Sequence, residues 1–280
     1  MSIDSTWFRC PNCFSDLSPI DECVFGCERG HRFDRSKHGY LTLLDPKAPR
    51  TVGDDHEMLA ARAAFLGRGA YLPIAEELAR TATSADVGER LRVADLGCGT
   101  GYYSARIGDA RPGAEFLLAD RSPHAVRSAL RVVPGATGVV LDIWRPLPLR
   151  SDVADVVVNV FAPRNPSEFA RILRPGGRLV VVVPRADHLR ELLELGSLLG
   201  IPPQKAETVT EQFAAVGLLR HSATRVQYAI EADSATRVLL AGMGPSAHHA
   251  ASLADGSTVG SLEVTVAVDV LAFELASPCG

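Results

Sequence analysis

Four cysteines fall within the first 27 residues, and some of them have the spacing of metal ligands. Cys10-Pro-Asn-Cys13 is followed, after thirteen residues, by Cys27-Glu-Arg-Gly-His31. A structural zinc ion takes four tetrahedral thiolate or imidazole ligands, and two tight turns can bring such pairs to one ion. Six cysteines in 280 residues are too few for a disulfide framework. The pattern predicts a closed, structural zinc site at Cys10, Cys13, Cys27 and His31.

Two other residues compete for the fourth ligand position. Cys23 lies four residues before Cys27, and His38 stands between a lysine and a glycine in what we expect to be an exposed turn. We prefer His31, because its spacing pairs it directly with Cys27. The alternative, that these are ordinary buried cysteines, is disfavoured by two pairs at ligand spacing.

A glycine-rich turn between a strand and a helix is the second chemical feature. It reads Asp95-Leu-Gly97-Cys98-Gly99-Thr100-Gly101, and an aspartate closes the next apolar segment, Phe116-Leu-Leu-Ala-Asp120. Glycines let the backbone approach a ligand closely, and a carboxylate at the end of the second strand suits a ribose. The early aspartate and the G-x-G-x-G spacing favour S-adenosylmethionine over a nicotinamide dinucleotide, the weaker alternative. The predicted donor-binding residues here are Asp95, Gly97, Gly99, Thr100, Gly101 and Asp120, with Cys98 as a packing residue.

Polar residues after the third and fourth strands complete this site. Asp142 follows the third strand, where we expect it to bond the adenine amino group. Asn159 lies in Asn159-Val-Phe161-Ala-Pro163, which ends the fourth strand and should face the methyl group.

These residues need a parallel sheet that gathers strand ends at one edge. Alternating apolar segments and helical patterns predict βαβ units, and so an α/β, Rossmann-like domain. A helix N-capped by Asp54 should reach Leu66, and two late β-segments should form an antiparallel hairpin. The expected strands are 91–96, 114–119, 138–141, 153–160, 178–183, 218–230 and 261–275. The other expected helices are 72–83, 102–110, 123–132, 166–173, 187–199 and 234–240.

Composition is that of an ordinary globular protein: 46% of residues are hydrophobic, 22% are charged, and the net charge is −4. No apolar stretch is long enough for a membrane helix, and the first residues contain no apolar signal core. We therefore expect a cytoplasmic protein. One local stretch is basic and could contact nucleic acid, although a solvated surface explains it equally well: Arg29, Arg32, Arg35, Lys37, Lys47 and Arg50, against Asp34 and Asp45.

Taken together, the motifs closely resemble the RlmA family of 23S rRNA guanine-N1 methyltransferases. The resemblance covers nearly the whole chain. It includes His31-Arg-Phe-Asp34, Arg62-Ala-Ala-Phe65-Leu66, Tyr71 and Pro184-Arg-Ala-Asp-His188-Leu189. It implies a class I methyltransferase domain over 86–280, a zinc-binding, RNA-docking module over 1–45, and a linker with helices over 46–85. It further implies that Tyr71 and His188 contact the donor.

The arginine-rich, lysine-poor composition resembles the actinomycete branch of the family, which modifies guanine 748 and includes a tylosin-resistance enzyme. The resemblance thus implies methylation of a 23S rRNA hairpin loop and macrolide resistance. The chain lacks the N-P-P-Y-type motif of enzymes that methylate exocyclic amines, which is consistent with a ring-nitrogen target.

The general base that removes the guanine N1 proton is not identified by the sequence. Asn159, Asp142 and His188 are the candidates. Other functions also stay open: methylation of guanine 745, methylation of a small natural product, and RNA binding without catalysis. The last would tolerate loss of Asp95 or Asp120, and both are present.

Overall fold

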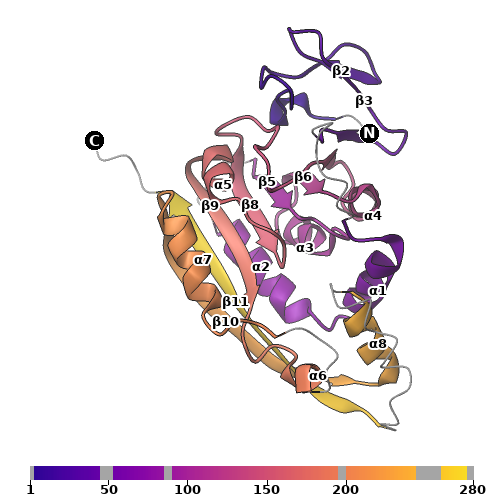
Figure 1. Cartoon of the computed structure of the whole chain (residues 1–280), viewed down its shortest axis with the longest axis vertical. Coiled ribbons are helices and arrows are strands. Elements are labelled where there is room, and N and C mark those ends of the chain that lie inside the picture. The colour runs from indigo at the N-terminus through magenta and orange to yellow at the C-terminus, as the bar shows by residue number, and fades with distance from the viewer. Residues whose placement is uncertain (1–2, 45–52, 85–89, 195–199, 244–259, 276–280) are drawn as a thin grey trace.

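The computed structural model describes residues 3–44, 53–84, 90–194, 200–243 and 260–275. These residues form two sheets. A small three-stranded sheet contains β1 (Ser18–Pro19), β2 (Val24–Gly26) and β3 (Arg32–Asp34). An eight-stranded sheet has the order β10-β11-β9-β8-β5-β6-β7-β4. Figure 1 shows the small sheet at one end of the molecule and the long β10 and β11 along one side.

Parallel strands form the centre of the large sheet: β5 (Arg92–Leu96), β6 (Glu115–Asp120), β7 (Thr137–Val140), β8 (Ala154–Val160) and β9 (Leu173–Pro184). Every residue of β8 is buried, as expected for a strand covered on both faces. The hairpin prediction is confirmed, because β10 (Leu218–Ala232) and β11 (Leu262–Leu275) pair antiparallel, and β11 also pairs with β9.

Helices cover both faces of this sheet. One core contains apolar residues of α1 (His56–Gly67), α2 (Leu72–Thr83), α3 (Tyr102–Ala110), α4 (Pro123–Val132) and α8 (Ser234–Gly242). The opposite core contains those of α5 (Pro166–Ile172) and α7 (Lys205–Ala214), together with residues of the N-terminal segment. The short α6 (Arg190–Glu194) lies against β11.

The N-terminal segment is part of the second core. The described residues contain no helix between β7 and β8. In its place, the 3-10 helix η1 (Ser5–Trp7) and Phe8 lie against the connection, where Phe8 bridges Leu149 and Arg150 N–H donates to the Trp7 carbonyl oxygen (2.9 Å). Trp7 and Phe8 are almost completely buried. The zinc-binding segment therefore covers a sheet face that would otherwise be exposed.

One strand of this segment joins the large sheet. β4 (Tyr40–Thr42) pairs parallel with β7, with Leu41 opposite Val139. This strand is absent from the expected strands, because a pairing partner almost a hundred residues away leaves no local signature. Leu41 is fully buried, and this burial stabilises the short edge strand.

Several helices and strands differ from expectation, among them β9, which begins at Leu173 and not at 178. Asp55 caps α1 by accepting Met58 N–H (2.8 Å), whereas Asp54 instead pairs with Arg62. The helix predicted from 187 begins at Arg190, and its residues 195–199 lie outside the described residues. Helix α7 was not predicted, because its sequence is polar and only Val209 and Phe213 are buried.

Candidate zinc and methyl-donor sites

The four predicted zinc ligands lie together in the structure. All their ligand atoms are within 4.8 Å of one another. His31 Nδ1 lies 3.5 Å from Cys10 Sγ and 3.4 Å from Cys27 Sγ, and Cys13 Sγ lies 3.6 Å from Cys27 Sγ. Tetrahedral zinc with ordinary bond lengths separates its ligands by about 3.5–3.8 Å. The geometry therefore fits a zinc ion bound through Nδ1 of His31.

The surroundings of these cysteines shift their pKa values in opposite directions. A backbone hydrogen bond at Ser15 lowers the pKa of Cys13 to about 6, whereas burial raises the pKa of Cys10 to about 11. Because thiolate is the form that binds metal, Cys13 is prepared for zinc, and Cys10 releases its proton when zinc binds.

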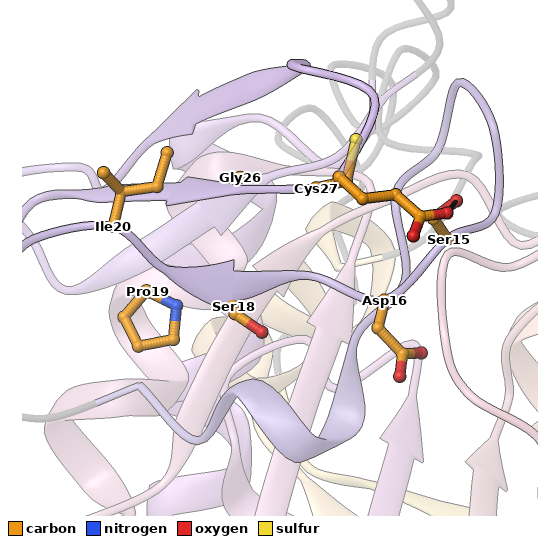
Figure 2. Close-up of a pocket in the computed structure, with 8 residues that line it drawn as sticks. Ser15, Asp16, Ser18, Pro19, Ile20, Gly26 and Cys27 are labelled. Carbon is orange, nitrogen blue, oxygen red and sulfur yellow. Dashed lines mark hydrogen bonds between the residues drawn. The ribbon is translucent and has the colours of Figure 1, made fainter.

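The competing ligands lie elsewhere. Cys23 is exposed and outside the cluster, and its carbonyl oxygen accepts Arg35 N–H (2.6 Å). His38 lies among positive groups, and burial, Arg127 and Lys37 lower its pKa. An open hollow beside the zinc site is lined by Asp16 and Glu28 (Figure 2). These acids make the hollow unsuitable for an RNA phosphate.

The three glycines of the donor turn are required for different structural reasons. A Cβ on Gly97 would lie 2.4 Å from Ala162 Cβ, and one on Gly101 would lie 2.7 Å from Ala129 Cα. Both positions are thus required by packing, against the loop after β8 and against α4. A Cβ on Gly99 would approach Arg62 Nη1 at 3.3 Å and nothing else among the described residues. Gly99 is therefore the position open to a ligand, while Thr100 is buried beside it.

Two carboxylates face this turn. Asp120, at the end of β6, accepts Gly99 N–H (3.0 Å) and Ser122 N–H (2.9 Å). Burial raises its pKa. Asp95, in β5, accepts the Ser104 hydroxyl proton (2.6 Å), and burial raises its pKa to about 7. Each carboxylate retains acceptor capacity, which suits a donor with ribose hydroxyls and a net positive charge.

Tyr71 and His188, which the resemblance suggested as donor contacts, are bonded to each other. The Tyr71 hydroxyl lies 3.1 Å from His188 Nε2, and His188 Nδ1 accepts Ala267 N–H (3.2 Å). Both residues are buried, and burial lowers the pKa of His188 to about 4. The ring is therefore neutral, with its proton on Nε2.

Asp142 and Asn159 are both held by neighbours. One Asp142 oxygen pairs with Arg121, and the other accepts Trp144 N–H (3.1 Å). The Asn159 amide donates to the carbonyl oxygens of Leu96 (2.8 Å) and Pro163 (2.9 Å), so it ties the end of β5 to the loop after β8.

Three residues at the site were missed as site residues by sequence reasoning. Arg62 covers the turn at Gly99, and its Nη2 donates to the Met243 carbonyl oxygen (2.7 Å). Arg121 pairs with Asp142. Phe161 lies in the loop after β8 with a left-handed backbone (φ 52°) and 40% exposure. Only Phe161 had a local signal, as an aromatic at the end of a buried strand.

Fold and site together define an S-adenosylmethionine-dependent methyltransferase with an N-terminal zinc ribbon. Residues 8–48 match the N-terminal zinc ribbon of RlmA, and residues 93–177 match a methyltransferase domain. The chain is 43% identical to the 23S rRNA (guanine(748)-N(1))-methyltransferase of Streptomyces fradiae, over 87% of this chain and 86% of that protein. It belongs to the RlmA-type family of 23S rRNA guanine-N1 methyltransferases.

Two further comparisons agree with this family and with this fold. A relative from Micromonospora griseorubida, named for guanine-N1 methylation of 23S rRNA, is 40% identical over 86% of each chain. The YcgJ protein of Bacillus subtilis shares the fold, with a TM-score of 0.51 at 16% identity, over 71% of this chain and 98% of that one. None of the described helices is long and apolar enough to cross a membrane.

Proposed function

We propose that this protein transfers the methyl group of S-adenosylmethionine to N1 of guanine 748 in a hairpin loop of 23S rRNA. The observation that carries the proposal is the 43% identity to the Streptomyces fradiae enzyme over 87% of the chain. The arrangement of Gly99, Asp95 and Asp120 supports the donor assignment, and the Cys10–His31 cluster supports the zinc ribbon. A ribosomal RNA substrate implies work in the cytoplasm.

The bound donor supplies an activated methyl group, so the protein's main task is to place the acceptor nitrogen. That nitrogen must lie in line with the methyl carbon, at about 3–3.5 Å. Guanine N1 is on the Watson–Crick edge, so the base must be unpaired or turned out of its stack. Loops and unstacked bases are the parts of RNA that proteins usually read, which favours a hairpin loop.

The surroundings of the three candidates for the general base support a ranking among them. Both His188 nitrogens are engaged, and its low pKa keeps the ring neutral. The Asn159 amide has no basic atom, and its nitrogen holds two carbonyl groups. Asp142 is the one carboxylate among them, and its bonds to Arg121 and Trp144 leave lone pairs available. We therefore assign His188 and Asn159 to positioning, with Asp142 at the adenine or as proton acceptor.

We propose that the ribbon docks the RNA backbone. Arg29, Arg32 and Lys37 are exposed, and the charges of Lys37 and of Arg127 and Arg131 of α4 all act on His38. Such a surface would bind phosphates, in keeping with a division into a docking module (1–45), a linker with helices (46–85) and a catalytic domain (86–280). Lys47 and Arg50 of the predicted basic stretch lie outside the described residues.

Reverse transcription on ribosomal RNA from expressing cells tests the proposal. An N1 methyl blocks Watson–Crick pairing, so a stop should occur one nucleotide before guanine 748, with 1-methylguanosine rising in nucleoside mass spectrometry. A methyl on the exocyclic N2 can still pair and would give a weaker stop. Methylation of guanine 748 should raise resistance to tylosin more than resistance to other drugs. Drug-susceptibility tests on the same cells measure this difference.

Two outcomes would change the assignment. A stop at guanine 745 would keep the reaction and move the target. Absence of any stop in this hairpin, with methyl label entering a small molecule, would overturn the RNA substrate.

A further inference from the structure

The loop that follows β8 presents an aromatic ring at the strand edge where the donor residues gather. Phe161 has a left-handed backbone, which is unfavourable for a bulky side chain. Its ring is 40% exposed, one of the few large apolar side chains of the described residues to be so exposed. An unfavourable backbone that exposes an apolar ring indicates a constraint from function rather than from packing.

The surroundings of Phe161 hold it in place. Its ring stacks on His188, with centroids 6.0 Å apart and planes inclined by 23°, and its centroid lies 6.2 Å from that of Tyr71. Its N–H donates to the Val182 carbonyl oxygen (3.3 Å). The Asn159 side chain holds the same loop by donating a hydrogen bond to the Pro163 carbonyl oxygen. One side of the ring thus packs against His188 and Tyr71, the two residues expected to contact the donor, and the rest of the ring is exposed to solvent.

We propose that Phe161 forms part of the binding site for the target nucleotide, in which its ring stacks on the unpaired purine. This inference rests on the proposed RNA methyltransferase function and extends it to a residue that selects an unpaired nucleotide. Stacking of bases on aromatic rings is one of the main interactions by which proteins bind single-stranded RNA.

Phe161→Ala tests the stacking role. An RNA oligonucleotide that copies the hairpin around guanine 748 serves as substrate, and calorimetry gives the Kd of S-adenosylmethionine. We expect kcat/KM for the RNA to fall about ten- to hundredfold. The donor Kd should stay within twofold of wild type, and Phe161→Tyr should restore most of the activity. Leu219→Ala, at an exposed apolar residue of β10, is the matched control and should change neither quantity.

The outcomes separate this site from the proposed function. If wild-type protein methylates the hairpin and Phe161→Ala keeps the wild-type kcat/KM for the RNA, the stacking proposal is wrong. If Phe161→Ala weakens donor binding as much as RNA turnover, the ring belongs to the donor site and the stacking proposal is overturned. If wild-type protein methylates no 23S rRNA hairpin, the proposed function itself fails.

Discussion

Tyr71 and His188, 117 residues apart in sequence, share a hydrogen bond of 3.1 Å between the phenol oxygen and Nε2. The other imidazole nitrogen accepts Ala267 N–H, so the proton must reside on Nε2 and be donated to Tyr71. The phenol keeps its own proton for a further acceptor. This arrangement connects the start of α2 with the segment after β9, and it depends on a neutral imidazole.

Because His188 is neutral in the folded protein, the free energy of unfolding should decrease at acid pH. Burial lowers its pKa from 6.5 to about 4. Between these values the unfolded chain binds more protons, so the contribution of His188 to stability falls as pH decreases through this window. The difference in unfolding free energy between wild type and His188→Gln should shrink by up to about 3 kcal/mol from pH 7 to pH 4. Urea unfolding of both proteins measures it, and a constant difference would contradict a neutral His188.

Asp95 should make donor binding depend on pH. Burial raises its pKa to about 7, so the carboxylate of the donor-free protein is about half ionised at neutral pH. Because the donor is positively charged, its Kd should rise as pH falls below 7, approaching tenfold per pH unit. Titration calorimetry at several pH values measures this. Asp95→Asn should bind more weakly with a flatter profile, whereas the exposed Asp109→Asn should keep the wild-type slope.

Replacement of two neighbouring glycines should separate donor binding from folding. Gly99→Ala and Gly101→Ala both place a side chain on a left-handed backbone, which costs about 1–2 kcal/mol each. Gly101→Ala also meets Ala129 backbone at 2.7 Å, so it should lose about 1–3 kcal/mol more. Gly99→Ala should instead lose donor affinity at least tenfold. Thermal unfolding and calorimetry measure the two effects, and equal stability of both variants would refute the packing role of Gly101.

Removal of the zinc should affect the RNA more than the donor. Cys27→Ala should lower zinc from one ion per chain to almost none by metal analysis, because tetrahedral coordination loses a ligand. RNA methylation should be lost while the donor Kd changes little. Cys23→Ala, outside the cluster, should keep its zinc and activity. Freshly purified wild-type protein without zinc would disprove the site.

Local patterns were sufficient to predict much of this protein. The cysteine and histidine spacing predicted all four clustered ligands, because each pair is brought together by its own tight turn. Helices α2, α3 and α4 begin and end where their patterns indicated. Apolar periodicity and the proline, glycine or serine at each helix start are properties of adjacent residues.

Other features depend on contacts between distant segments, and these only the tertiary structure decided. The sequence shows β4 as a short apolar fragment, but its place beside β7 is set by burial of Leu41 in a core built from other segments. Helix α7 carries too few apolar residues to be recognised, and it forms because Val209 and Phe213 pack on a sheet face that already exists.

The chemistry of the site likewise depends on contacts between distant segments. That Asp142 pairs with Arg121, that His188 is neutral, and that Gly101 serves packing rather than the donor all follow from neighbours supplied by the fold. A residue's type and spacing determine which chemistry it can perform. Its protonation and free lone pairs are determined by which dipoles and charges the folded chain places within a few ångströms, and those distances are properties of the tertiary structure.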